Sequence, residues 1–162
     1  MDKITVLAVI AVLIASSLVY AEVALPPIST EEVLAKKKTD LNNTEWTIEV
    51  KPMGGKGKAE NDTIVFTDGQ VVSKEMEQSG YVPTNFSVRL LEDETFTWET
   101  MQTSEKDGVA FWRGDIGPDG IMRGVISKRD NKNKTSDFNF VSVNMQKIAP
   151  VLEPSQPAVV QE

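Results

Sequence analysis

Apolar and polar residues alternate along most of residues 86–143, in short runs separated by turn-forming clusters. In the first of these runs Phe86, Val88 and Leu90 are apolar, and the residues between them are polar. A period of two residues is typical of a β-strand with one face buried and the other in water. The pattern therefore predicts an antiparallel β-sheet of consecutive strands joined by short turns.

The turns between these strands predict the pairing residue by residue. A turn at 92–94 sets Val88 opposite Trp98 on the apolar face. The next turn, at 104–108, sets Glu99 opposite Arg113 on the other face of the sheet, where opposite charges stabilise a cross-strand pair. Together with the third turn, at 117–121, these turns also oppose Leu90 with Phe96, Trp98 with Gly114, Thr100 with Trp112, Met101 with Phe111, Gly114 with Gly124, and Asp115 with Arg123, whose opposite charges are again expected to pair.

The third turn, at 117–121, has the sequence Gly-Pro-Asp-Gly-Ile. Proline presets the first torsion angle of such a loop, and Gly120 can adopt the positive φ that the loop requires. On either side of this turn, Gly114 and Gly124 are opposed and lie beside Trp98 in the predicted register. Glycines at such a position predict a bend in the sheet that makes room for the indole ring.

Further strands are predicted on both sides of this region, at 46–50, 63–66, 71–72 and 137–143. The second and third of these runs flank Asp-Gly at 68–69, which is a strong sequence signal for a β-hairpin. The sequence leaves open whether the loop of that hairpin has two or three residues.

Eight strands joined mostly by tight turns form a meander, and closing it into an up-and-down barrel removes the exposed sheet edges. The predicted fold class is therefore all-β, with one barrel domain over residues 41–147. The side chains predicted to face inward are Trp46, Ile48, Val50, Ile64, Phe66, Phe86, Val88, Leu90, Phe96, Trp98, Trp112, Ile116, Met122, Ile126, Phe138 and Phe140. Their many aromatic rings predict an interior that is mostly filled.

The first residues predict export of the protein. Lys3 precedes an uncharged, largely aliphatic stretch that ends in Val19-Tyr20-Ala21, which matches a signal-peptidase site of the A-x-A type. Residues 1–21 are thus interpreted as a signal peptide, with a periplasmic or extracellular destination. The alternative is an uncleaved anchor, because a stretch of this length could just span a bilayer.

The segments that flank the predicted barrel are short. Within residues 22–40, Ser29 and Glu32 have the spacing of a helix capping box, so either a short helix from about Thr30 to Lys38 or a flexible linker is predicted there. One helical turn is predicted at 74–78, within the domain. Residues 148–162 contain three prolines without periodicity, which predicts a disordered tail.

Composition narrows the function mainly by exclusion. The chain has no histidine and no cysteine, so it cannot form disulfides, histidine-dependent catalytic triads or histidine-ligated zinc sites. Its net charge of −7 disfavours binding to nucleic acids, whose phosphates it would repel. No catalytic residues, metal site or cofactor are predicted, and the protein is interpreted as non-enzymatic.

The meander, the size of the domain and the early tryptophan in Leu41-Asn42-Asn43-Thr44-Glu45-Trp46 resemble the lipocalins and related calycins. Lipocalins usually carry Gly-x-Trp at this point, and here Thr44 replaces the glycine. The resemblance implies an exported carrier of a small apolar molecule or lipid, bound in the mouth of the barrel. It also implies that Trp46 plugs the closed end.

Two candidate sites follow from these predictions. The ligand of a carrier is predicted to contact Phe96, Trp98, Thr100 and Trp112. Alternatively, the protein is an envelope interaction or structural module that uses its tail and an outer apolar patch of Met101, Phe111 and Val125. A competing expectation is that Val33 and Leu34 of the N-terminal segment cover this patch.

Overall fold

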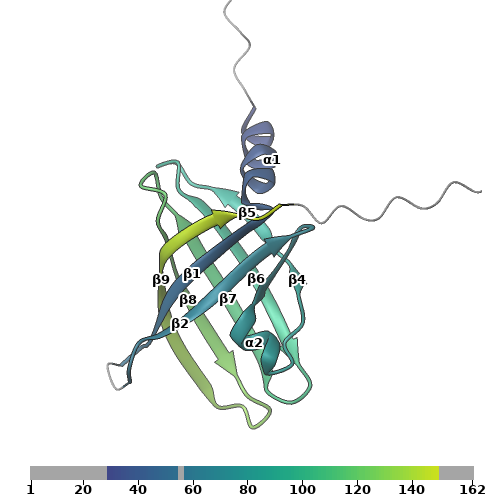
Figure 1. Ribbon diagram of the computed structural model, residues 1–162, viewed down its shortest axis with the longest axis vertical. Coiled ribbons are helices and arrows are strands. Elements are labelled where there is room, and N and C mark those ends of the chain that lie inside the picture. Colours follow the sequence, from purple (N-terminus) through teal and green to yellow (C-terminus); the bar gives the residue numbers. More distant parts are fainter. Residues whose placement is uncertain (1–28, 55–56, 150–162) are drawn as a thin grey trace, which may run out of the picture.

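The computed structural model describes residues 29–54 and 57–149, which form a β-barrel with one helix at each end (Figure 1). In chain order the elements are α1 Thr30–Leu41, β1 Thr44–Pro52, β2 Glu60–Thr67, β3 Gln70–Ser73, α2 Lys74–Gln78, β4 Thr84–Asn85, β5 Ser87–Leu90, β6 Phe96–Ser104, β7 Gly108–Ile116, β8 Met122–Arg129 and β9 Thr135–Lys147.

The strands form one antiparallel sheet in the order β4-β3-β2-β1-β9-β8-β7-β6-β5, so the last strand pairs with the first. The two strands at the ends of this order, β4 and β5, are separated in the chain only by Phe86. One bent segment therefore leaves β3 and joins β6, and Thr100 strengthens the junction by donating a hydrogen bond to the Asn85 carbonyl oxygen at 2.8 Å. The predicted all-β meander is confirmed, and its fourth strand is divided in two because it changes partner.

The predicted strand pairings are confirmed. Val88 lies opposite Trp98, Glu99 opposite Arg113, and Gly114 opposite Gly124. The hairpin at 68–69 has a two-residue loop, because Thr67 pairs directly with Gln70. Both loop residues have positive φ, at 50° and 76°, which matches the right-handed twist of the flanking strands.

Aromatic rings fill the middle of the barrel. The Trp98 ring contacts Phe66 edge-on, with centroids 5.0 Å apart, and stacks against Trp112 at 6.4 Å. A methyl group on Gly114 would lie 2.3 Å from Nε1 of Trp98, so glycine is required for this close approach. The core cluster consists of Leu41, Trp46, Ile48, Ile64, Phe66, Val71, Met76, Tyr81, Phe86, Phe96, Trp98, Ala110, Trp112, Met122, Ile126 and Phe140.

The charged side chains on the outer face follow the predicted register only in part. Glu99 accepts a hydrogen bond from Arg89 at 2.9 Å and lies 3.8 Å from Arg113. The ion pair predicted between Asp115 and Arg123 is wrong, although the two residues are opposed. Arg123 binds Asp119 of the adjacent turn instead, at 2.9 Å, because that carboxylate is held close by the loop.

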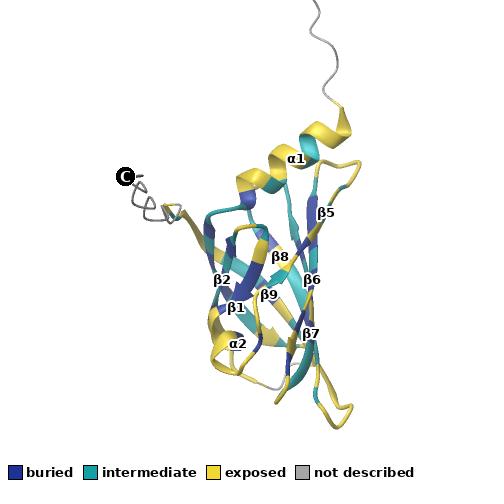
Figure 2. Ribbon diagram, turned by 90° about the vertical axis from the view of Figure 1, so that its right-hand side faces the viewer, coloured by how far each residue is buried: buried dark blue, intermediate teal, exposed yellow. Residues whose placement is uncertain are grey.

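Helix α1 closes one end of the barrel. Its capping box is confirmed, since Ser29 accepts a hydrogen bond from the backbone of Glu32 and the Glu32 carboxylate accepts one from the backbone of Ser29. Leu34 and Leu41 pack against the core, whereas the outer side of the helix is exposed (Figure 2). The helix alternative for this segment is therefore correct, and the helix extends three residues beyond the predicted end at Lys38.

Helix α2 partly covers the opposite end, at the predicted position. Ser73 caps it by accepting a hydrogen bond from the Met76 amide, and Asp62 accepts one from the Glu75 amide. Gln102, buried in the wall, donates to carbonyl oxygens on both sides of the α2 segment at 3.3 Å. These hydrogen bonds fix α2 and the residues that flank it to β2, β3 and β6.

The predicted signal peptide at 1–21 and nearly all of the predicted tail at 148–162 lie outside the described residues. Ile148 still donates a backbone hydrogen bond to the Asn43 carbonyl oxygen at 2.8 Å. Within residues 29–54 and 57–149, neither helix has the length and apolar character needed to cross a membrane.

Candidate functional site

The four predicted ligand-binding residues come together inside the barrel, and all are buried. Trp98 and Trp112 have exposed fractions of 0% and 1%, and Phe96 and Thr100 are nearly as enclosed. The hydroxyl of Thr100 is bound to the backbone at the barrel junction. Their packing therefore forms the core, and their predicted contact with a ligand stays a prediction.

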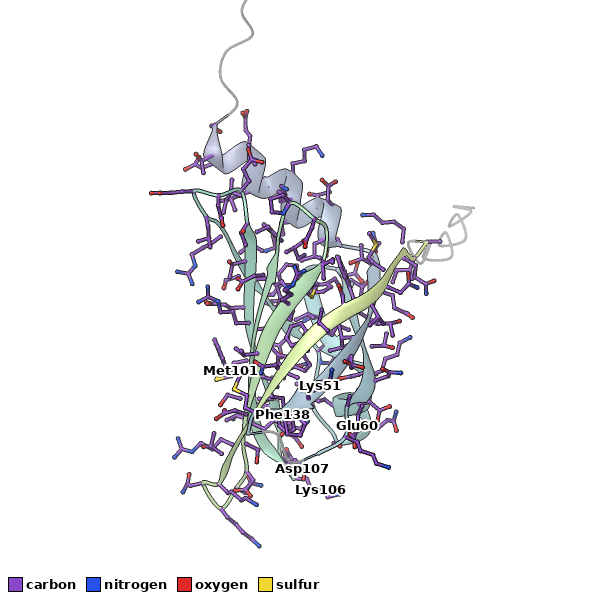
Figure 3. All side chains as sticks on the ribbon, turned by 90° about the vertical axis from the view of Figure 1, so that its left-hand side faces the viewer. Lys51, Glu60, Met101, Lys106, Asp107 and Phe138 are labelled. Atoms are coloured by element: carbon purple, nitrogen blue, oxygen red, sulfur yellow. The ribbon has the colours of Figure 1, made fainter. Side chains whose placement is uncertain are left out.

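A cleft opens at the end of the barrel that α2 only partly covers. It consists of two adjoining pockets of about 250 Å³ and about 390 Å³, which share Ser79, Lys128 and Phe138. We call it the Lys128 cleft. Figure 3 shows Glu60, Asp107 and Phe138 together at this end, away from α1. The lining residues are Val50, Glu60, Asn61, Asp62, Glu75, Met76, Ser79, Tyr81, Asp107, Ile126, Lys128, Asp130, Lys134, Ser136 and Phe138.

Strand β8 places Lys128 in this cleft. Met122 and Ile126 point into the barrel and are buried, and Lys128 follows them at the same two-residue spacing. It lies opposite Ala110, whose side chain is fully buried on the inner face. The amine sits over the ring of Phe138, with 5.5 Å between Nζ and the ring centroid. An ammonium group thus lies half-buried on an apolar floor.

Three carboxylates surround this amine without pairing with it. Burial lowers the pKa of Lys128, and the charges of Asp62, Asp107 and Glu60 oppose part of that effect. Asp62 is already engaged, since it accepts hydrogen bonds from the Ser73 hydroxyl at 2.6 Å and from two backbone amides. The cleft therefore presents the half-buried Lys128 inside a rim that carries several carboxylates and the exposed Lys134.

At the wall of the cleft, the Tyr81 hydroxyl donates a hydrogen bond to the Asp107 carbonyl oxygen at 2.9 Å. Burial raises the pKa of Tyr81, and the nearby charge of Asp107 adds to the effect. The phenol is therefore a neutral structural donor that fixes the loop carrying Asp107.

The α1 end offers less space. A pocket of about 190 Å³ lies between the helix and the barrel rim, and Phe96 is one of its lining residues. Trp46, predicted to plug this end, is buried there, and its indole nitrogen donates to the Thr44 hydroxyl at 2.9 Å. Leu41 and Ile116 are further apolar residues that line this pocket.

The predicted partner surface lies on the outer wall. Met101 and Phe111 face each other on β6 and β7, with exposed fractions of 57% and 41%, and Val125 is half-buried on β8. The expectation that Val33 and Leu34 cover this patch is wrong, because α1 packs across the barrel end and Met101 lies on the side wall (Figure 3). Within the described residues the patch is open.

Sequence reasoning missed Lys128 as a site residue, although the signal was present. The predicted inward positions Met122 and Ile126 extend with the same period to residue 128. An inward lysine at the end of a barrel strand marks a mouth, because a charged group cannot lie in a packed core without a partner.

In chemical terms, the cleft can bind and orient a small molecule. It combines an apolar floor, the half-buried ammonium group of Lys128 and a charged rim of carboxylates with Lys134, a mixture typical of small-molecule sites. Comparison with known proteins adds no identity: no family model, curated protein or solved structure matches the chain.

Proposed function

We propose that the protein is an exported, non-catalytic, lipocalin-like barrel that binds a small molecule with an apolar body. The Lys128 cleft at the barrel mouth is the binding site in this proposal. The observation that carries it is the half-buried amine of Lys128 above Phe138, in a concave site between β1, β2, β8 and β9.

The packing of the barrel favours the mouth over the interior. A ligand beside Trp98 and Trp112 would have to displace rings that are already in contact. Protein cores are packed to the density of organic crystals, so such displacement is costly. A ligand in the Lys128 cleft requires no rearrangement of the core.

Native mass spectrometry of the full-length protein, expressed in an exporting host and purified without detergent, tests this function. We expect a reproducible added mass that is lost on denaturation, and its value gives the ligand class. Addition of the ligand to labelled protein should then shift the amide NMR signals of Phe138 and Lys128, and leave those of Trp98 and Met101 unchanged. A bare monomer that also fails to bind any member of a small-molecule panel would contradict the proposal.

A second function, docking of an envelope protein on the outer patch, is favoured by the exposure of the opposed Met101 and Phe111. In that case Met101→Lys should abolish a dimer or a co-purified partner seen by native mass spectrometry. The matched control is Val143→Lys, on β9, where an apolar side chain is 62% exposed outside the patch. Equal effects of the two variants would argue against the patch.

A further inference from the structure

We propose that the Lys128 cleft selects an organic monocarboxylate, whose carboxylate pairs with Nζ of Lys128 and whose apolar body lies on Phe138, Val50 and Met76. This inference rests on the proposed small-molecule function and specifies its ligand class. Three features of the cleft carry it: the position of the amine, the charges around it and the depth of the floor.

The first feature is an ammonium group without a counterion. Among the described residues Lys128 forms no ion pair, and its one close partner is the ring of Phe138. A cation over an aromatic ring is only partly compensated for the loss of water. A carboxylate that enters the cleft supplies the missing charge-assisted hydrogen bond, in a setting where such bonds are strong.

The second feature is the acidic rim, which limits the charge of the ligand. Asp62 cannot turn toward a ligand because three donors hold it. Asp107 and Glu60 act on the charge of Lys128 from outside pairing distance. The whole lining carries the carboxylates of Glu60, Asp62, Glu75, Asp107 and Asp130 against two lysines, Lys128 and the exposed Lys134. This excess of negative charge repels anions, so a phosphate monoester or a dicarboxylate is disfavoured, whereas a single negative charge can be balanced by Lys128.

The third feature is a shallow floor, which limits the length of the ligand. Ile126 is buried directly beneath the cleft and lies opposite Trp112, whose ring belongs to the packed core. The body of the ligand must therefore lie along the mouth, against Phe138 and Val50, and cannot extend down the barrel axis. Short-chain or aromatic acids fit this shape better than long-chain lipids.

Calorimetric titration of the full-length protein with octanoate and with octan-1-ol tests the inference, since the two probes share a chain length and differ in charge. We expect octanoate to bind about ten- to a hundredfold more tightly, which is the scale of one hydrogen bond to a charged group. Lys128→Met should remove this preference. Lys132→Met is the matched control, because Lys132 is exposed in the neighbouring loop outside the cleft.

A second variant, which is expected to strengthen octanoate binding, completes the test. Asp107→Asn removes one rim charge while leaving the backbone oxygen that Tyr81 binds, so octanoate should bind about twofold more tightly. Equal binding of octanoate and octanol, unaffected by Lys128→Met, would overturn the inference and leave the proposed function standing. If neither these probes nor any ligand found by native mass spectrometry binds the cleft, both proposals fail. Tighter binding of a cationic amphiphile than of octanoate would show that the rim carboxylates hold the ligand, and it would overturn the inference.

Discussion

The middle of the barrel and its mouth at the α2 end are built from the same strands with the same alternation, yet one is solid and the other is hollow. In the middle, inward positions carry large rings, and Gly114 and Gly124 give those rings the space they need. At the mouth, the next inward position on β8 is Lys128, which cannot be enclosed. The identity of a few inward residues thus decides where a barrel of this size can accept a ligand.

The largest effect is expected from Gly124→Ala in the solid region. A methyl group there would lie 2.1 Å from the Arg113 carbonyl oxygen and 2.4 Å from the Phe140 ring. Because a backbone atom cannot move aside cheaply, we expect a loss of about 3 kcal/mol in the free energy of unfolding, measured in urea.

Gly120→Ala is the control for this substitution. Gly120 has φ of 72° with no atom near the added methyl, so only the backbone cost of about 1 kcal/mol applies. Equal losses for the two variants would show that the middle of the barrel is not tightly packed.

A double-mutant cycle gives the next largest effect. Trp98→Phe shortens the ring that a methyl on Gly114 would strike, so Gly114→Ala should be better tolerated in the Trp98→Phe background. We expect a favourable coupling of about 1–2 kcal/mol from urea unfolding of the four proteins. Phenylalanine also removes an indole N–H that has no hydrogen-bond partner within the described residues. Strict additivity would mean that glycine is not required by the indole.

At the mouth, Lys128→Met should stabilise the protein at neutral pH by up to about 1 kcal/mol, since the amine is only half-buried. Burial lowers the pKa of Lys128 in the folded state. Between that value and the unfolded value of about 10.4, the folded protein binds fewer protons, so wild-type stability rises with pH. The advantage of the variant should therefore shrink as the pH approaches about 10.4.

Thermal unfolding of both proteins from pH 7 to 10.5 measures this difference, with Lys132→Met as a control that should show no such trend. A destabilised Lys128→Met protein at pH 7 would mean that the amine has a strong internal partner, and that the mouth is not an open site.

The smallest effect is expected on the outer wall. Phe111→Thr places a β-branched residue, which suits a strand, at this position and removes a ring that is 41% exposed. Its free energy of unfolding should change by no more than about 0.5 kcal/mol, the usual range for surface positions. A loss above about 2 kcal/mol that depends on protein concentration would show that the ring is buried between copies of the chain.

Much of the fold could be predicted from the sequence because it depends on local turns and a two-residue period. The opposed pairs Val88–Trp98 and Gly114–Gly124 follow from turn position alone. Where side chains choose among several partners, prediction failed: Arg123 binds Asp119 in its own turn and not the opposed Asp115. The strand register fixes which residues are opposed, but a long side chain such as that of Arg123 can still reach several partners.

The candidate site was harder to predict, because it depends on which end of the barrel is covered. The sequence contained an inward Lys128 and a helical turn at 74–78, but it did not show that the backbone of this turn donates hydrogen bonds to Ser73 and Asp62, which hold it beside the mouth. Likewise the sequence predicted α1, but not that the helix lies across the barrel end and leaves Met101 uncovered.

By itself the amino-acid sequence determined the strands, their order and pairing, and the glycines that admit Trp98, because these follow from turn chemistry and alternation. It also excluded histidine and cysteine chemistry by composition. The tertiary structure decided that α2 leaves a cleft at the mouth and that Lys128 lies in this cleft over the ring of Phe138. These outcomes require contacts between β1, β2, β8, β9 and α2, which lie far apart in the chain and meet only when the barrel closes.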